Sequence, residues 1–177
     1  MTPYHKKLAD EPAYQISTFR LLPLGVFLIT RLNLAHQPLQ EAQGRELIKL
    51  DSAVVANGAF TFNGRQDAAV NRYITYTPAE GKRIMADFFL ENGNIAVALG
   101  EESKVSGTTN NDIYQAYKNE SGALNKEMRA LYEKSKAEDL TDEQKAELEK
   151  QMEELDAKLN DLTYNTIDAN ITNPVGI

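Results

Sequence analysis

The sequence predicts an α+β fold: an antiparallel β-sheet, either a small sandwich or an open barrel, followed by a long antiparallel helical hairpin. Three observations lead to this prediction. Alternating apolar and polar runs separated by turn residues occupy 46–98, and apolar residues then repeat at helical spacing over 113–162. The charge also changes: residues 1–99 hold ten Lys and Arg against nine Asp and Glu, whereas residues 100–177 hold nine against seventeen. The two halves therefore have different architectures.

Two hairpins are expected in the sheet, because paired turn residues separate apolar runs. The run "ELIKLDSAVV" begins at Glu46, and "FTFNG" begins at Phe60. Asn57 and Gly58 lie between them, and both residue types tolerate the positive φ of a tight hairpin turn. In the same way, the sequence Glu-Asn-Gly-Asn at 91–94 separates "MADFFL" from "IAVAL". With "VNRYITYTP", these runs predict four or five antiparallel strands.

The second half predicts two amphipathic helices with a break at 136–140. Residues 108–111 offer N-cap oxygens to the first helix, and Asp112 is placed to interact with the helix dipole. The apolar stripe of this helix is Ile113, Tyr117, Leu124, Met128 and Leu131. The second helix begins at "TDEQ", where Thr141 and Gln144 match a capping box. Its apolar residues step by four and three, which is a heptad seam: Leu148, Met152, Leu155, Leu159 and Leu162.

These helices are expected to fold back on each other as an antiparallel hairpin with a substantially buried seam. Each seam is narrow, so the hairpin packs on the sheet, on a further domain or on another subunit. We expect weak, concentration-dependent homodimerisation through the helices. The acidic outer face is predicted to be solvated, and a docking surface for a basic partner is the alternative.

The predicted division of the chain follows from these patterns. It comprises an uncertain N-terminal segment at 1–43, an antiparallel β domain at 44–107, the helical hairpin at 108–172, and the start of a connection to a further domain at 173–177. In the first segment, the apolar run "FRLLPLGVFLIT" from Phe19 is too short to span a bilayer. It is either a late apolar region of a signal peptide or a buried strand pair broken at 23–25.

The composition excludes or disfavours several classes of function. The net charge of −7 and the pI near 4.9 disfavour nucleic acid, which binds to basic surfaces. The chain has no cysteine, so it carries no disulfide, thiolate metal site or thiol redox chemistry of its own. His5 and His36 lie far apart, without the spacing of a metal site. The stretch "GEESKVSG" lacks the GK[ST] ending of a phosphate loop.

No catalytic, cofactor-binding or metal-binding residues are predicted, and no cofactor. The carboxylates in or beside the strands are Asp51, Asp87 and Glu91. General acid–base catalysis needs two such groups in one cleft, and nothing in this spacing brings them together. The segment Asn92-Gly93 is explained by turn chemistry.

Several stretches resemble a known family. The most specific are "DSAVVANGAFTFNG", "FFLENGNIAV" and "VSGTTNND", and the helical "NKEMRALYEK" and "LTDEQKAELEKQMEELD" continue the likeness. Over 44–177 the chain resembles a bacterial cell-envelope domain of unknown function that stands N-terminal to thioredoxin-like domains of the TlpA/AhpC-TSA type. Such proteins have a lipoprotein-type signal and a Y-x-I-x-G first strand. Here "YQIS" at 14–17 is similar to that strand, but the following residues depart from it.

The resemblance implies a non-catalytic accessory domain of the periplasm or outer cell envelope, which positions a redox domain or its client. Its partner would be a C-terminal thioredoxin-like domain reached through "NITNPVG", and the full-length protein would be a thiol–disulfide oxidoreductase. The alternative is a self-contained protein-interaction or ligand-binding module of the envelope. Neither reading involves nucleic acid or a transmembrane segment. "DSA" at 51–53 also resembles an O-glycosylation acceptor of such bacteria, so Ser52 is either a glycosylation site or an ordinary strand-edge serine.

Overall fold

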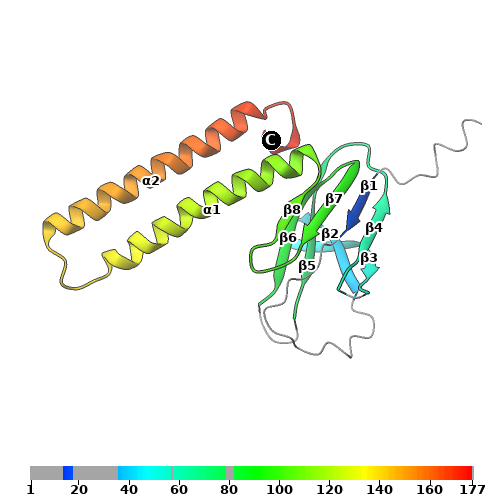
Figure 1. Cartoon of the computed structure of the whole chain (residues 1–177), viewed down its shortest axis with the longest axis horizontal. Coiled ribbons are helices and arrows are strands. Elements are labelled where there is room, and N and C mark those ends of the chain that lie inside the picture. Colours follow the sequence, from blue (N-terminus) through cyan, green and yellow to red (C-terminus); the bar gives the residue numbers. More distant parts are fainter. Residues whose placement is uncertain (1–13, 18–35, 57, 79–81, 177) are drawn as a thin grey trace, which may run out of the picture. The chain divides into compact units, whose positions relative to one another are not determined.

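The computed structural model describes residues 14–17, 36–56, 58–78 and 82–176. Strands come first and two long helices follow, so the predicted α+β class, antiparallel sheet and then helical hairpin, is confirmed (Figure 1). The chain divides into two compact units between Asp112 and Ile113. We call them the β unit and the helical unit, and the first turn of the first helix belongs to the β unit.

The described part of the β unit contains two four-stranded sheets. The strands are β1 (Tyr14–Ser17), β2 (His36–Gln43), β3 (Glu46–Val54), β4 (Thr61–Gly64), β5 (Val70–Tyr76), β6 (Ile84–Leu90), β7 (Gly93–Ala98) and β8 (Lys104–Ser106). The β1 sheet has the order β4-β1-β7-β8, and the β2 sheet has the order β3-β2-β5-β6. Neighbouring strands are antiparallel except β1 and β7, which are parallel.

Both sheets contribute to one hydrophobic core. The β1 sheet supplies Ile16, Ile95 and Val97, and the β2 sheet supplies Ile74 and Phe88, all of them fully buried. Strand β1 is the "YQIS" segment, which resembled the first strand of the family in the sequence. The segment is a strand here, and its Ile16 side chain lies in the core. The two sheets are therefore two layers around one core.

Both predicted hairpins are wrong, although the first turn forms. Ala56 and Ala59 exchange backbone hydrogen bonds of 2.8 and 3.0 Å, and Gly58 has φ +76°. However, β3 pairs with β2, whereas β4 pairs with β1 in the other sheet. The segment 91–94 likewise connects β6 of the β2 sheet to β7 of the β1 sheet. Each turn instead carries the chain from one sheet to the other. The predicted hairpins are wrong because an alternation of apolar residues shows which side chains face the core, but not which strand pairs with which.

Strand β2 lies within the segment 1–43 that sequence analysis left uncertain. Its sequence, HQPLQEAQ, has few apolar residues and contains Pro38, which disfavours a central strand. It is nevertheless central, between β3 and β5. Pro38 is tolerated because the ladder with β5 spans only Leu39 and Gln40. The alternatives for the apolar run from Phe19 lie outside the described residues.

The helices are α1 (Thr109–Ser135) and α2 (Asp142–Ala169), followed by the 3-10 helix η2 (Pro174–Gly176). The capping box is confirmed: Gln144 N donates to Thr141 Oγ1 at 3.2 Å, and Thr141 N donates to Gln144 Oε1 at 2.9 Å. Of the five seam residues only Leu155 is buried, and the other four are half-buried. No helix among the described residues is long and apolar enough to cross a bilayer.

A side-chain hydrogen bond joins α1 to α2, and an ion pair lies near the end of α1 itself. The Tyr117 hydroxyl and Thr163 Oγ1 are 3.2 Å apart and form a hydrogen bond. At the end of α1, Lys136 Nζ donates to Glu133 Oε1 at 2.8 Å and lies 4.4 Å from the centre of the Tyr132 ring. The hydrogen bond to Glu133 raises the pKa of Lys136 above its ordinary value.

Candidate functional site

The three carboxylates in or beside the strands, which nothing in the sequence groups together, lie on different elements. Asp51 lies on β3 and Asp87 on β6, at opposite ends of the strand order of the β2 sheet. Glu91 instead binds Asn110 in the first turn of α1. His36 is exposed at the start of β2, and the described residues contain no group of His, Asp and Glu that could hold a metal ion. His5 lies outside the described residues.

A cluster of polar side chains surrounds the start of α1. Asn110 N donates to Glu91 Oε1 at 3.2 Å, and Asn110 Nδ2 donates to Glu91 Oε2. Gly107 N donates to Asp112 Oδ1 at 2.9 Å, so Asp112 binds the preceding loop as well as lying in the first turn. We call this group, completed by Asn111, the asparagine clasp. It fixes the first turn of α1 to the end of β6.

Asn111 is the centre of the clasp and is only 1% exposed. Its Oδ1 accepts from Phe89 N at 2.9 Å, and its Nδ2 donates to Phe89 O at 2.8 Å. A second bond from Nδ2 reaches Thr108 Oγ1 at 2.8 Å. Within the described residues β6 is an edge strand, and the side-chain amide of Asn111 pairs with its backbone as a neighbouring strand would.

A second asparagine makes the same kind of contact. Gln66 N donates to Asn92 Oδ1 at 3.1 Å, and Asn92 Nδ2 donates to Gln66 O at 2.8 Å. Asn92 stands in the turn that carries the chain between the sheets. Its amide therefore ties that turn to the loop after β4, which supports the structural reading of Asn92-Gly93.

At Gly107, next to the clasp, the backbone lies close to the backbone of Asn94. Gly107 has φ +101°, and a Cβ atom there would collide with the carbonyl oxygen of Asn94. Only glycine fits both conditions without strain. "VSGTTNND" was recognised in the sequence as a helix start. Its contacts to β6 were missed, because side-chain bonds between distant segments leave no local pattern.

Buried and half-buried polar groups of β2 and β5 also bind one another, although Arg72 Nε is buried without a hydrogen-bond partner in the described part of the chain. Gln37 Nε2 donates to Thr75 O, and Thr75 Oγ1 donates to Gln40 Oε1 at 2.7 Å. Arg72 forms an ion pair with Glu41 at 3.4 Å. These bonds join β2 to β5, where the ladder is short, so they have a structural explanation.

The helical unit carries a shallow groove where α1 and α2 are joined. It has a volume of about 820 Å³, and its apolar lining includes Ala137, Leu140 and Leu148. Glu143 and Glu147 border it. Lys134, Thr141 and Gln144 complete its lining.

The end of α2 is closed by asparagine side chains. Asn170 Nδ2 donates to Thr166 O at 2.8 Å, and Asn173 Nδ2 donates to Asn170 Oδ1 at 2.9 Å. Val175 N donates to Asn173 Oδ1 at 3.0 Å. "NITNPVG" is thus a compact turn that binds back to α2. The prediction that 173–177 begins a connection is not tested by this geometry.

Ser52, which is either a glycosylation site or an ordinary strand-edge serine, lies half-buried on β3, and its N–H donates to Asp51 Oδ1 at 2.7 Å. Its glycosylation stays a prediction.

One family comparison matches part of the chain. The model of the family described as Domain of unknown function (DUF4369) matches residues 36–114. No curated protein and no solved structure matches the chain. The match runs from the first residue of β2 into α1, so it includes seven of the eight strands and the asparagine clasp. It is shorter than the resemblance over 44–177 and leaves out α2. The region from β2 to the clasp is therefore similar to a domain of unknown function.

Proposed function

We propose that the chain is a non-catalytic accessory domain of a thiol–disulfide oxidoreductase in the periplasm or outer cell envelope. In this proposal the β unit is a structural support, and the helical unit is a spacer and an interface for a redox domain or its client. The observation that supports it best is the asparagine clasp. This group of polar side chains fixes the first turn of a long helical hairpin, and its members are bound to one another and to backbone.

The chemistry of the chain agrees with a supporting role. Disulfide exchange proceeds by attack of a thiolate, and this sequence has no cysteine. Redox activity would come from a thioredoxin-like domain that follows the turn at 170–176. That turn is compact, so it would hold the start of the next domain near the end of α2.

The coding sequence that follows Ile177 is the first test. A CxxC pair in a βαβ pattern supports the proposal, and a stop codon directly after Ile177 overturns it. The biochemical test uses the full-length product with and without the region 36–176. We expect similar insulin reduction from both, because insulin needs only the thiols, and slower turnover of the native client by the shortened form. Equal client turnover by both forms would contradict an accessory role.

The chain alone supplies a further check. Purified protein should not accelerate insulin disulfide reduction above background, because no thiolate is present to attack the disulfide. Acceleration that persists after contaminating thioredoxins have been removed would refute the assignment of the chemistry to another domain.

A self-contained interaction module is the second candidate, and an exposed apolar face favours it. Tyr164 and Ile167 lie three residues apart on α2, Ile171 follows in the turn after it, and they are 71%, 41% and 65% exposed. Such a face suits a client or a second copy, including the weak homodimer expected from the helices. Replacing Tyr164 and Ile167 by serine should abolish that association while the helix content stays unchanged. An unaltered sedimentation profile would exclude this face.

A further inference from the structure

We propose that β3 is a self-association edge, along which two copies of this chain pair antiparallel to form one continuous sheet. The proposed register places Lys49 opposite Asp51 of the second copy. This inference does not depend on the redox proposal, because it concerns the β unit and a partner of the same sequence.

The exposed apolar residues of the β unit point to this strand. Among its described residues, the exposed large hydrophobic side chains are Ile48, Leu50, Val54 and Met85. Three of the four lie on β3, and they are 37%, 46% and 48% exposed. Strand β3 spans nine residues and stands at the end of the β2 sheet, with β2 as its only strand neighbour in the described residues. A long apolar edge of this kind is a template for another strand.

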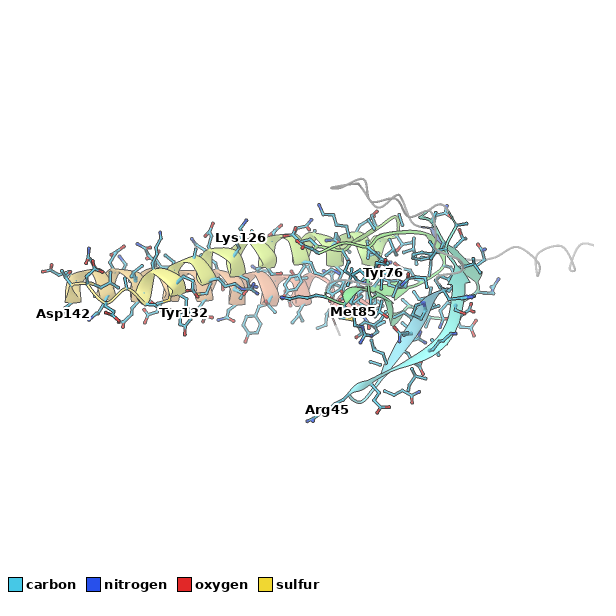
Figure 2. All side chains as sticks on the ribbon, turned by 90° about the horizontal axis from the view of Figure 1, so that it is seen from below. Arg45, Tyr76, Met85, Lys126, Tyr132 and Asp142 are labelled. Atoms are coloured by element: carbon cyan, nitrogen blue, oxygen red, sulfur yellow. The ribbon has the colours of Figure 1, made fainter. Side chains whose placement is uncertain are left out.

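The β2–β3 hairpin also extends beyond the sheet. Strand β5 pairs with Leu39 and Gln40 but with no later residue of β2. Within the described residues, 41–48 therefore form a two-stranded ribbon that pairs only with itself, and Figure 2 shows it reaching away from the other strands with Arg45 at its tip. Two-stranded ribbons are marginally stable in water. A second copy along β3 would supply this ribbon with a third strand and cover Ile48.

The charged residues of β3 favour pairing with a second copy of β3 over pairing with an unrelated strand. When β3 pairs antiparallel with itself over its full length, Glu46 faces Val54 of the second copy. The same register centres the pair on Leu50 and places Lys49 opposite Asp51, twice in each dimer by symmetry. Opposite charges directly across an antiparallel pair stabilise it. The register that uses the whole strand is thus also the register that pairs its charges.

The irregularity of β3 fits the same symmetry. Leu39 lies opposite Asp51 and Gln40 opposite Lys49, so Leu50 is an extra residue, a β-bulge. A bulge disturbs pairing with a regular strand. In the proposed dimer both bulges fall on the symmetry axis, so the strands remain in register on either side.

The other sheet edges are short or occupied. Strands β4 and β8 have four and three residues. The edge of β6 is bound by Asn111 at Phe89. Within the described residues, β3 is therefore the edge with the length to support association.

The test is a charge swap in the full 177-residue chain, measured by sedimentation velocity over a concentration series. Lys49→Asp places two aspartates opposite each other, and Asp51→Lys does the same with two lysines. Each single variant should raise the dimer dissociation constant at least about tenfold, because two attractive pairs become repulsive. The double variant restores both pairs and should return the constant to within about threefold of the parent.

Matched controls separate this effect from net charge and from folding. Lys126→Asp and Glu120→Lys make the same charge changes at exposed positions of α1 and should leave the constant unchanged. Thermal melting shows whether each β3 variant is folded. A parent that stays monomeric at about 1 mM, as it would if another segment of the chain covered β3, overturns the proposal. Dimerisation that survives both single variants overturns it too, and would point to the helices.

Discussion

Replacing Asn111 by alanine removes the centre of the asparagine clasp. The variant loses three hydrogen bonds: two to the backbone of Phe89 and one to Thr108 Oγ1. At roughly 0.5–1.5 kcal/mol for each bond, the β unit should lose about 2–4 kcal/mol of its free energy of unfolding. Alanine is also the better helix former, and this offsets up to about 0.7 kcal/mol.

Asn119→Ala is the matched control. Asn119 lies on the exposed side of the same helix, and its Oδ1 accepts only from the side chain of Gln115, at 2.9 Å. This variant has the same gain in helix propensity without the buried bonds, so its stability should stay within about 0.5 kcal/mol of the parent. The difference between the two variants isolates the clasp.

The assay is urea unfolding followed by circular dichroism, combined with hydrogen exchange of the β6 peptide 84–90. A loss of 2–4 kcal/mol corresponds to exchange that is about 30- to 800-fold faster, when exchange occurs through unfolding of the β unit. Equal unfolding curves and equal exchange for Asn111→Ala and Asn119→Ala would refute the argument that the clasp holds α1.

Asn111→Asp tests the hydrogen bonds that Nδ2 of the Asn111 side chain donates, because aspartate keeps the oxygen and loses the NH₂ group. The carboxylate still accepts from Phe89 N, but it places a buried charge against Phe89 O, so burial should raise its pKa. The folded state then binds a proton more tightly than the unfolded state. The variant should be closest to the parent near pH 4 and lose stability as the pH rises through the folded-state pKa. A variant that becomes more stable between pH 4 and pH 7 would contradict this burial.

Three further measurements test other parts of the structure. Gly107→Ala should lower the free energy of unfolding in urea by more than about 2 kcal/mol, because φ is +101° and the new methyl group meets Asn94 O. The control is Gly122→Ala, in open space on α1, which should raise the free energy of unfolding by about 0.5–1 kcal/mol. Equal effects of the two variants would refute the strain argument. Leu155→Ala should cost about 2–4 kcal/mol and reduce the helix signal on heating, because Leu155 is the buried seam residue; an unchanged melting curve would show that the hairpin does not pack through it. Protein from the native host should exceed the unmodified mass if Ser52 is glycosylated, and an unmodified intact mass removes that prediction.

Local patterns predicted the elements better than their partners. The strands after Glu46, the helix start at 108–111 and the capping box at Thr141 all follow from rules that involve a few neighbouring residues. The pairing of β3 with β2 and of β4 with β1 depends on residues far apart in the chain. A turn that suits a hairpin also suits a crossing between layers, because both need positive φ, as at Gly58.

Strand β2 and the clasp show two other limits. The sequence of β2 is polar with a proline, and it is a strand because its neighbours on both sides are strands. Asn111 is ordinary for a first helical turn. Its function becomes visible only when Phe89, distant in sequence, lies beside it.

The parallel pairing of β1 with β7 joins two segments that lie far apart in the sequence. Tyr14 pairs with Gly93, so the β1 sheet cannot close until nearly all of the β unit has been synthesised. The hairpin of α1 and α2 joins neighbouring segments and forms on the microsecond scale of local helix contacts. In refolding of the complete chain, we therefore expect the β1 sheet to close more slowly than the helical hairpin forms.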